Sequence, residues 1–166
     1  MISGVIPAYN EEKRIGRCLS ALTSQTAPRD RYEIIGVDGG SQDQTWDIAT
    51  DYADKVFIQK SCRVAGAGTD GFNRSRYDLV ATTDADSVVA PNLVESIIKS
   101  FSDPEVVLSF APVTSIDKTC KHRQHSHLFN GLMHFGAMTG LYLLYPRVYY
   151  RFSETSAHAG RNEPDP

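Results

Sequence analysis

Two aspartates, Asp84 and Asp86, stand one residue apart directly after the apolar run 78–83. Side chains at i and i+2 of an extended segment point to the same side, so the two carboxylates converge on one small volume. A hard divalent cation such as Mg²⁺ or Mn²⁺ would relieve their repulsion, and magnesium commonly shares its coordination shell with substrate phosphates. The alternative is a solvated turn in which Asp86 caps the next helix. This short pattern alone leaves both interpretations open.

A second acidic position, Asp38, ends the apolar run 32–38 and is followed by a Gly-Gly-Ser turn. Glycines such as Gly40 let the backbone approach a ligand closely and permit positive φ. A carboxylate at a strand end can accept hydrogen bonds from a nucleobase or a ribose. The alternative role is a tight turn, with Ser41 or Asp43 capping the following helix. That role does not exclude ligand contact by Asp38.

A third polar segment, Pro7-Ala8-Tyr9-Asn10-Glu11, offers an aromatic ring and a carboxylate after the first apolar run. Punctuation between a strand and a helix would by itself explain the proline and the asparagine, which can cap the helix. The segment is therefore a candidate binding element that also has a purely structural explanation.

The elements that must position these three segments alternate along the chain. We expect strands at 2–7, 32–38, 55–59, 78–83 and 105–113. We expect helices at 10–26, 39–54 and 92–101, a loop at 61–71 opening a short helix near Phe72–Arg76, and weaker signals for a helix at 121–137 and a strand at 140–145. This alternation predicts a three-layer α/β/α sandwich around a mostly parallel, Rossmann-like sheet. Ligands bind such sheets at the carboxyl ends of strands near a topological switch point, where all three polar segments are expected.

The composition fits one globular domain. The chain has 166 residues, a formal net charge of −3 and 41% hydrophobic residues, which allows a sizeable core. We place the domain at 1–152 and expect the tail 153–166, which has linker composition, to be disordered. No basic stripe is present to neutralise phosphates, so nucleic acid is not expected as a partner.

The cysteines and the apolar runs bear on location. Cys18, Cys62 and Cys120 are far apart, which favours reduced thiols in a cytoplasmic protein. The first residues do not resemble a signal peptide. No uninterrupted apolar run reaches the roughly 20 residues that a membrane-spanning helix needs.

Two further patterns are weaker signals. His122, His125 and His127 could bind zinc with Cys120, but the spacing is poor, and a polar basic loop is the favoured interpretation. The letters GAGTDG at 66–71 match GxGxxG. They follow a poor strand, and no acid is placed to hold a ribose, which disfavours a nicotinamide enzyme.

Together the three polar segments resemble the family 2 glycosyltransferases, which have the nucleotide-diphospho-sugar (GT-A) fold. VIPAYNEEKRIGRCLSAL (5–22) looks like the opening strand and helix of that family, YEIIGVDGGSQDQT (32–45) like its acidic turn, and YDLVATTDADSVVAPNLVESI (77–97) like its DxD strand. The resemblance implies a hexosyltransferase-type enzyme that inverts the anomeric carbon and needs Mg²⁺ or Mn²⁺. It implies a UDP- or GDP-linked donor and an unknown glycan or lipid-linked acceptor.

The resemblance also implies site residues, carried over by position. The nucleotide-sugar site comprises Pro7, Ala8, Tyr9, Glu11, Asp38, Gly40, Asp84, Ala85 and Asp86. Asp38 would hold the base, Asp84 would lie near the ribose and the diphosphate, and Asp86 would be the more direct metal ligand.

The sequence departs from the family pattern at several points. Gly39 stands where a second Asp is usual, and Gly68-Thr69 replace the usual Arg-Asn, a basic contact that Arg63 or Arg74 could supply. The family usually has a later acidic pair as general base, but here only Glu154 and the tail acids follow the run 140–152. The catalytic base therefore stays unassigned.

These departures leave other functions open. The chain could be a sugar-nucleotide-binding domain without complete catalytic machinery. A phosphatase of the haloacid dehalogenase type would use Asp84 as nucleophile and Asp86 as acid and base. The aromatic and basic residues of 141–152 could be buried in a core or a homodimer interface, or could contact a membrane surface peripherally.

Overall fold

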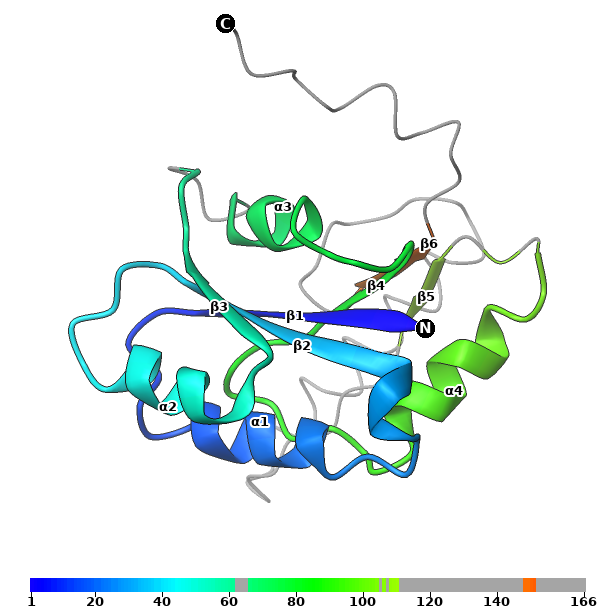
Figure 1. Cartoon of the computed structure of the whole chain (residues 1–166), viewed down its shortest axis with the longest axis horizontal. Coiled ribbons are helices and arrows are strands. Elements are labelled where there is room, and N and C mark those ends of the chain that lie inside the picture. Colours follow the sequence, from blue (N-terminus) through cyan, green and yellow to red (C-terminus); the bar gives the residue numbers. More distant parts are fainter. Residues whose placement is uncertain (62–65, 105, 107, 111–147, 152–166) are drawn as a thin grey trace, which may run out of the picture.

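The computed structural model describes residues 1–61, 66–104, 106, 108–110 and 148–151. Within them a six-stranded sheet has the order β3-β2-β1-β4-β6-β5 (Figure 1). The strands are β1 (Ile2–Ala8), β2 (Tyr32–Asp38), β3 (Lys55–Ile58), β4 (Leu79–Thr82), β5 (Leu108–Phe110) and β6 (Val148–Arg151). The first four pair in parallel, whereas β6 is antiparallel to both β4 and β5. The predicted, mostly parallel sheet is confirmed.

Helices cover both faces of the sheet (Figure 1). They are α1 (Ile15–Thr23), α2 (Thr45–Tyr52), α3 (Gly66–Phe72) and α4 (Leu93–Ser100), with a 3₁₀ turn, η1, at Arg29–Arg31. In Figure 1, α3 lies on one side of the sheet, and α1, α2 and α4 lie on the other. The described part of the chain is therefore the three-layer sandwich that the alternating pattern predicted.

The core divides into two clusters because successive side chains of a strand point to opposite faces. Ile6 and Ile34 pack with Leu19 of α1 and Ile97 of α4. On the other face, Val5, Ile35, Val37 and Val80 pack with Ala67 of α3. Every residue of β2 is buried, as expected for a parallel strand covered on both faces.

β1 lies between two partners that are distant in sequence. Ile2 is aligned with Tyr32 of β2 on one side and with Leu79 of β4 on the other. The chain runs from β1 to β2 to β3 in one direction and then returns to place β4 on the opposite side of β1. The gap between β1 and β4 is therefore the topological switch point.

Helix α3 differs from the sequence-based expectation. It covers Gly66–Phe72, where a loop was expected up to residue 71, and it ends at Phe72, where the short helix was expected to begin, so residues 73–76 are not helical. The reason is tertiary packing. A Cβ on Gly71 would collide with Cγ1 of Val5 and lie 3.0 Å from Cγ2 of Val37. The glycine that lowers helix propensity is what lets this helix approach the sheet.

The start of α1 also differs from expectation. Asn10 has a φ of 53° and does not cap the helix, which begins at Ile15. The Asn10 side chain instead accepts a hydrogen bond from the backbone amide of Gln42 at 2.9 Å. Asparagine tolerates the left-handed region better than other residues with a side chain, so Asn10 turns the chain rather than capping the helix.

Several expectations lie outside the described residues: the helix at 121–137, the strand at 140–145, the histidine cluster and the tail 153–166. Within the described ranges, the helices are all too short or too polar to cross a membrane.

Candidate active site

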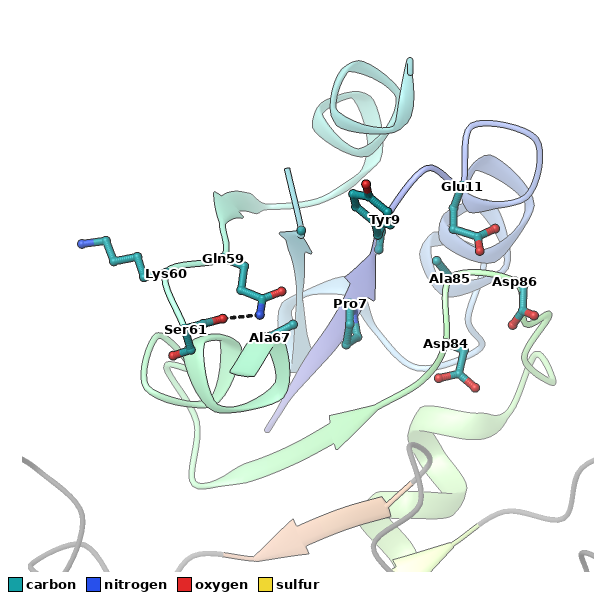
Figure 2. Close-up of a pocket in the computed structure, with 12 residues that line it drawn as sticks. Pro7, Tyr9, Glu11, Gln59, Lys60, Ser61, Ala67, Asp84, Ala85 and Asp86 are labelled. Carbon is teal, nitrogen blue, oxygen red and sulfur yellow. Dashed lines mark hydrogen bonds between the residues drawn. The ribbon is translucent and has the colours of Figure 1, made fainter. Parts of the chain in front are cut away.

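A cavity of about 770 Å³ opens where the carboxyl ends of β1 to β4 meet, beside the switch point (Figure 2). Most of the residues proposed from the sequence line it: Pro7, Ala8, Tyr9, Glu11, Asp84, Ala85 and Asp86. The lining residues that the sequence did not indicate are Gly39, Gln59, Lys60, Ser61 and Ala67. The three polar segments therefore meet at one edge of the sheet, as their positions after parallel strands require.

Asp38 and Gly40 are outside this lining. Asp38 is 3% exposed, and its Oδ2 accepts hydrogen bonds from the backbone amides of Gly40 and Ser41 at 3.0 and 2.9 Å. Its Oδ1 accepts one from the Ser41 hydroxyl at 2.5 Å. By strand alternation Asp38 shares a face with Ile34, which packs toward α1 and α4. The carboxylate thus shapes its own turn, and Gly39 faces the cavity in its place.

The loop between β1 and α1 is clamped by the loop between β2 and α2. The backbone amide of Asn10 donates to Ser41 Oγ at 2.9 Å, and that of Glu11 donates to Thr45 Oγ1 at 2.7 Å. Asp43 accepts from the amide of Thr45 at 3.0 Å, so Asp43, rather than Ser41, supports the start of α2. Although desolvation opposes the shift, hydrogen bonds from the side chain and amide of Thr45 hold the pKa of Asp43 below its ordinary value.

Tyr9 presents an aromatic face at the cavity, with 59% of the residue exposed. A Cβ added to Gly39 would lie 3.3 Å from both Cβ and Cδ2 of Tyr9. Tyr9 therefore occupies the space that a side chain at position 39 would need, and Gly39 is one of the departures from the family pattern.

Asp84, Ala85 and Asp86 follow β4 with alternating orientation. Ala85 is 3% exposed and belongs to the core cluster that contains Leu19 of α1. The side chains of Asp84 and Asp86 point away from that core (Figure 2). The Cys18 thiol on α1 approaches the Asp84 carbonyl oxygen at 3.5 Å, so α1 supports the acidic segment from behind.

The two carboxylates fit a cation held jointly with a ligand. Asp86 lies 3.5 Å from the Ser87 hydroxyl and 3.9 Å from Arg14 Nη1, which leaves its oxygens without a short contact in the described part of the chain. No group of three or more histidine, cysteine, aspartate or glutamate side chains that could hold a metal occurs among the described residues. Mg²⁺ is commonly bound by one or two carboxylates, water and substrate phosphates, and this pair matches that mode.

The fourth wall of the cavity is the segment Gln59–Ser61, which follows β3. Its shape is fixed by Asp70 of α3, which accepts hydrogen bonds from the amides of Lys60 and Ser61 at 2.6 and 3.0 Å. Gln59 Nε2 donates to the Ser61 carbonyl (Figure 2). The sequence did carry a signal for this wall, because the segment follows a parallel strand just as the other three lining segments do.

The model of the family described as Glycosyl transferase family 2 matches residues 3–157. The chain belongs to glycosyl transferase family 2. This match confirms the resemblance seen in the three sequence segments. Among curated relatives of this family 2 chain is glycosyltransferase AglE of Haloferax volcanii, which is 50% identical over 52 residues, or 31% of this chain and 17% of AglE.

Two solved structures share the fold of this family 2 chain. S. aureus TarS 1-349 in complex with UDP-GlcNAc aligns with a TM-score of 0.65 at 20% identity, over 71% of this chain and 36% of TarS. The mannosyltransferase PcManGT from Pyrobaculum calidifontis, in complex with GDP-Man and Mn²⁺, aligns with a TM-score of 0.60 at 25% identity, over 67% of this chain and 36% of PcManGT. This chain thus spans about a third of each solved chain and 17% of AglE.

Proposed function

We propose that this family 2 chain binds a UDP- or GDP-linked sugar and belongs to an inverting, metal-dependent glycosyltransferase. One observation carries the proposal. The cavity at the switch point brings the aromatic face of Tyr9 and the carboxylate of Glu11 together with the acidic pair Asp84 and Asp86. An aromatic ring suits a nucleobase, a carboxylate suits ribose hydroxyls, and paired carboxylates suit a metal ion on a diphosphate.

Each segment that lines the cavity has a proposed role in binding the donor. Tyr9 and Pro7 contact the nucleobase, and Asp38 acts on the base indirectly, by holding the turn that presents Gly39. Asp84 lies near the ribose and the diphosphate. Asp86 is the more direct ligand of Mg²⁺ or Mn²⁺.

The chemistry of transfer divides between the metal side and the acceptor side. A bound metal would neutralise the charge that develops on the diphosphate leaving group. Asp84 and Asp86 would hold that metal at the diphosphate end of the donor, while Tyr9 contacts the nucleobase at the other end. Inversion also requires a general base to deprotonate the acceptor hydroxyl, and the described residues contain none that we assign to that step.

A second candidate function is a sugar-nucleotide-binding domain without complete catalytic machinery. The distribution of the site favours it, because, among the residues that the structure describes, those that line the cavity lie between positions 7 and 86, in the segments proposed to bind the donor. The phosphatase alternative is set aside, because the family 2 match extends over 3–157.

Nucleotide binding tests the proposal. TarS was solved with UDP-GlcNAc and PcManGT with GDP-Man and Mn²⁺, so UDP, GDP and Mn²⁺ are the probes for calorimetry. We expect Mn²⁺ to tighten binding of UDP or GDP to the full chain at least about tenfold, as neutralisation of a diphosphate in a partly buried site would. Asp86→Asn should abolish that gain. Asp78→Asn, an exposed position before the other end of β4, is the matched control and should keep it.

Two kinds of outcome would contradict the proposal or choose between the two candidate functions. Nucleotide binding that does not respond to Mn²⁺, or a full Mn²⁺ response in Asp86→Asn, would refute the metal–diphosphate assignment. Release of free sugar from a UDP- or GDP-sugar, or transfer to an acceptor, would separate the enzyme from the binding domain. Tight binding with neither reaction would select the second candidate.

The setting of this reaction is also proposed. The predicted reduced state of the cysteines and the proposed nucleotide-sugar donor support a cytoplasmic location, with peripheral contact to a membrane if the acceptor is lipid-linked. That contact and a homodimer stay predictions, since most of 141–152 lies outside the described residues.

A further inference from the structure

Arg14 occupies a position that the helix itself does not favour. It immediately precedes α1, which carries no acid in its first turn. The amino end of a helix bears partial positive charge, so a cation there is disfavoured. The side chain of Arg14 is 59% exposed, and helix formation alone gives no reason for its charge.

The contacts of Arg14 link two walls of the cavity. Its Nε lies 3.1 Å from Glu11 Oε2, and its Nη1 lies 3.9 Å from Asp86 Oδ2. Glu11 comes from the loop after β1, and Asp86 from the segment after β4. One guanidinium therefore lies within electrostatic reach of Glu11, which lines the cavity, and of Asp86, the carboxylate proposed for the metal.

Glu11 Oε2 forms an ion pair with Arg14. This oxygen is buried and has no hydrogen-bond partner among the residues that the structure describes, because Arg14 Nε, at 3.1 Å, is close enough for an ion pair but is not aligned to donate. The arrangement is an electrostatic contact without directional bonds. Such a contact can shift when a ligand with its own charges and acceptors enters the cavity.

We propose, building on the donor site above, that Arg14 is a counter-charge that lowers the affinity of the cavity for a free metal ion and raises its affinity for a nucleoside diphosphate. Without ligands, its charge offsets the negative charges of Glu11 and Asp86. A lone divalent cation then meets repulsion from Arg14, whereas a diphosphate meets attraction.

Removing the charge should shift two affinities in opposite directions. In the full chain, Arg14→Gln should tighten the binding of Mn²⁺ alone, followed by electron paramagnetic resonance, by about threefold. It should weaken the binding of UDP or GDP in the presence of EDTA by about threefold. Both shifts should diminish as salt rises. A loss of local structure would weaken both affinities, so the opposite signs distinguish the counter-charge from a purely structural role.

The matched control is Arg17→Gln. Arg17 is exposed on α1 and lines a separate groove with Tyr52 and Val88, so both affinities should stay at wild-type values. Arg14→Lys keeps the charge without the planar fork and should fall between wild type and Arg14→Gln for both ligands.

The outcomes also separate this inference from the proposed function. Arg14→Gln values that match those of Arg17→Gln, or that weaken for both ligands, would overturn the role of Arg14 while leaving the donor site intact. A wild-type chain that binds neither Mn²⁺ nor nucleotide would overturn both the role of Arg14 and the proposed function.

Discussion

The carboxylate of Asp70 holds Ser61 twice, accepting hydrogen bonds from its backbone amide at 3.0 Å and from its hydroxyl at 2.9 Å. The amide of Lys60 donates to the same carboxylate at 2.6 Å. Hydrogen bonds from the backbone of Ser61 and of Lys60 are the main reason that the pKa of Asp70 lies below its ordinary value of 3.8. The cavity wall after β3 is therefore fixed by a charge on α3.

Replacing Asp70 with Asn should weaken nucleotide binding but leave the binding of Mn²⁺ alone unchanged. Asn has one acceptor oxygen, so it cannot keep every contact to Lys60 and Ser61. We expect UDP or GDP binding with Mn²⁺ to weaken about fivefold, the value of roughly one hydrogen bond. Binding of Mn²⁺ alone should not change, because Asp84 and Asp86 are on another wall.

Calorimetry on the full chain measures both affinities for Asp70→Asn. Asp51→Asn, an exposed position on α2, supplies the matched control. Unchanged nucleotide affinity in Asp70→Asn would show that the wall after β3 does not contact the nucleotide.

The exposed ring of Tyr9 should contribute to nucleotide binding and little to stability. Tyr9→Ala should lower the affinity for UDP or GDP about tenfold, as loss of one base–aromatic stack does, while Tyr9→Phe should retain it. The melting temperature should change little, because the residue is 59% exposed. Tyr52→Ala, at an exposed tyrosine on α2, is the control. Equal affinities for Tyr9→Ala and Tyr52→Ala would remove Tyr9 from the nucleotide site.

Two glycines of α3 should respond to alanine with opposite signs. Gly71→Ala would place a methyl group against Val5 and Val37, and overpacking of this kind costs about 2 kcal/mol of unfolding free energy. A Cβ on Gly68 meets no atom within 4 Å, so Gly68→Ala should stabilise the chain by about 0.5–1 kcal/mol through helix propensity.

Urea unfolding measures both changes, and the double variant Gly71→Ala with Val5→Ala tests the cause of the first. Gly71→Ala should lower the free energy of unfolding less in the Val5→Ala background than in the wild-type background, because the smaller side chain at position 5 leaves room for the added methyl group. A stabilising Gly71→Ala would contradict the close approach of α3 to the sheet.

Glu33 joins three strands at the opposite end of the sheet from the cavity. Its carboxylate accepts hydrogen bonds from Ser3 Oγ at 2.6 Å, the Arg76 amide at 2.7 Å and Lys55 Nζ at 2.9 Å. Burial alone would raise the pKa of Glu33, but these partners, with the charge of Lys55, hold it below its ordinary value of 4.5. The charged form is therefore the one that the fold stabilises.

Glu33→Gln should lower the free energy of unfolding by about 2 kcal/mol at neutral pH, because a nearly buried charge loses its bonds and its ion pair. A depressed folded-state pKa gives stabilisation that is present above the unfolded value of 4.5 and is lost as the pH falls through the folded-state pKa. The difference between wild type and Glu33→Gln in urea unfolding should therefore be constant near neutrality and shrink below that value. Exposed Glu95 on α4 provides the control, Glu95→Gln, and a pH-independent difference at Glu33 would contradict the assignment.

The sequence predicted the four parallel strands because their apolar runs are nearly continuous and are bounded by turn residues. It also located the cavity, since the carboxyl ends of parallel strands meet at one edge. The position of Asp38 could have been inferred as well. Asp38 and Ile34 are an even number of residues apart on β2, so their side chains point to the same face of the sheet. That face packs against α1, whereas Val37 points to the face that α3 covers.

Helix α3 could not be predicted, because three glycines in Gly66–Phe72 lower the helix propensity of the segment. Its stability comes from contacts with Val5 and Val37, which are distant in sequence. Asp70 of α3 fixes the conformation of the wall formed by Lys60 and Ser61, so that conformation could not be predicted, although the position of the wall after a parallel strand could. The contact between Arg14 and Asp86 could not be predicted either, because it joins two segments that are far apart in the sequence.

The central place of β1 determines the order in which the site can form. Its pairing with β2 brings Tyr9 and Glu11 beside Gly39, but Asp84 and Asp86 join them only when Leu79 aligns with Ile2. Contacts so distant in sequence form slowly. During folding, the nucleotide side should therefore be assembled first, and the two aspartates should be the last part of the donor site to reach their places.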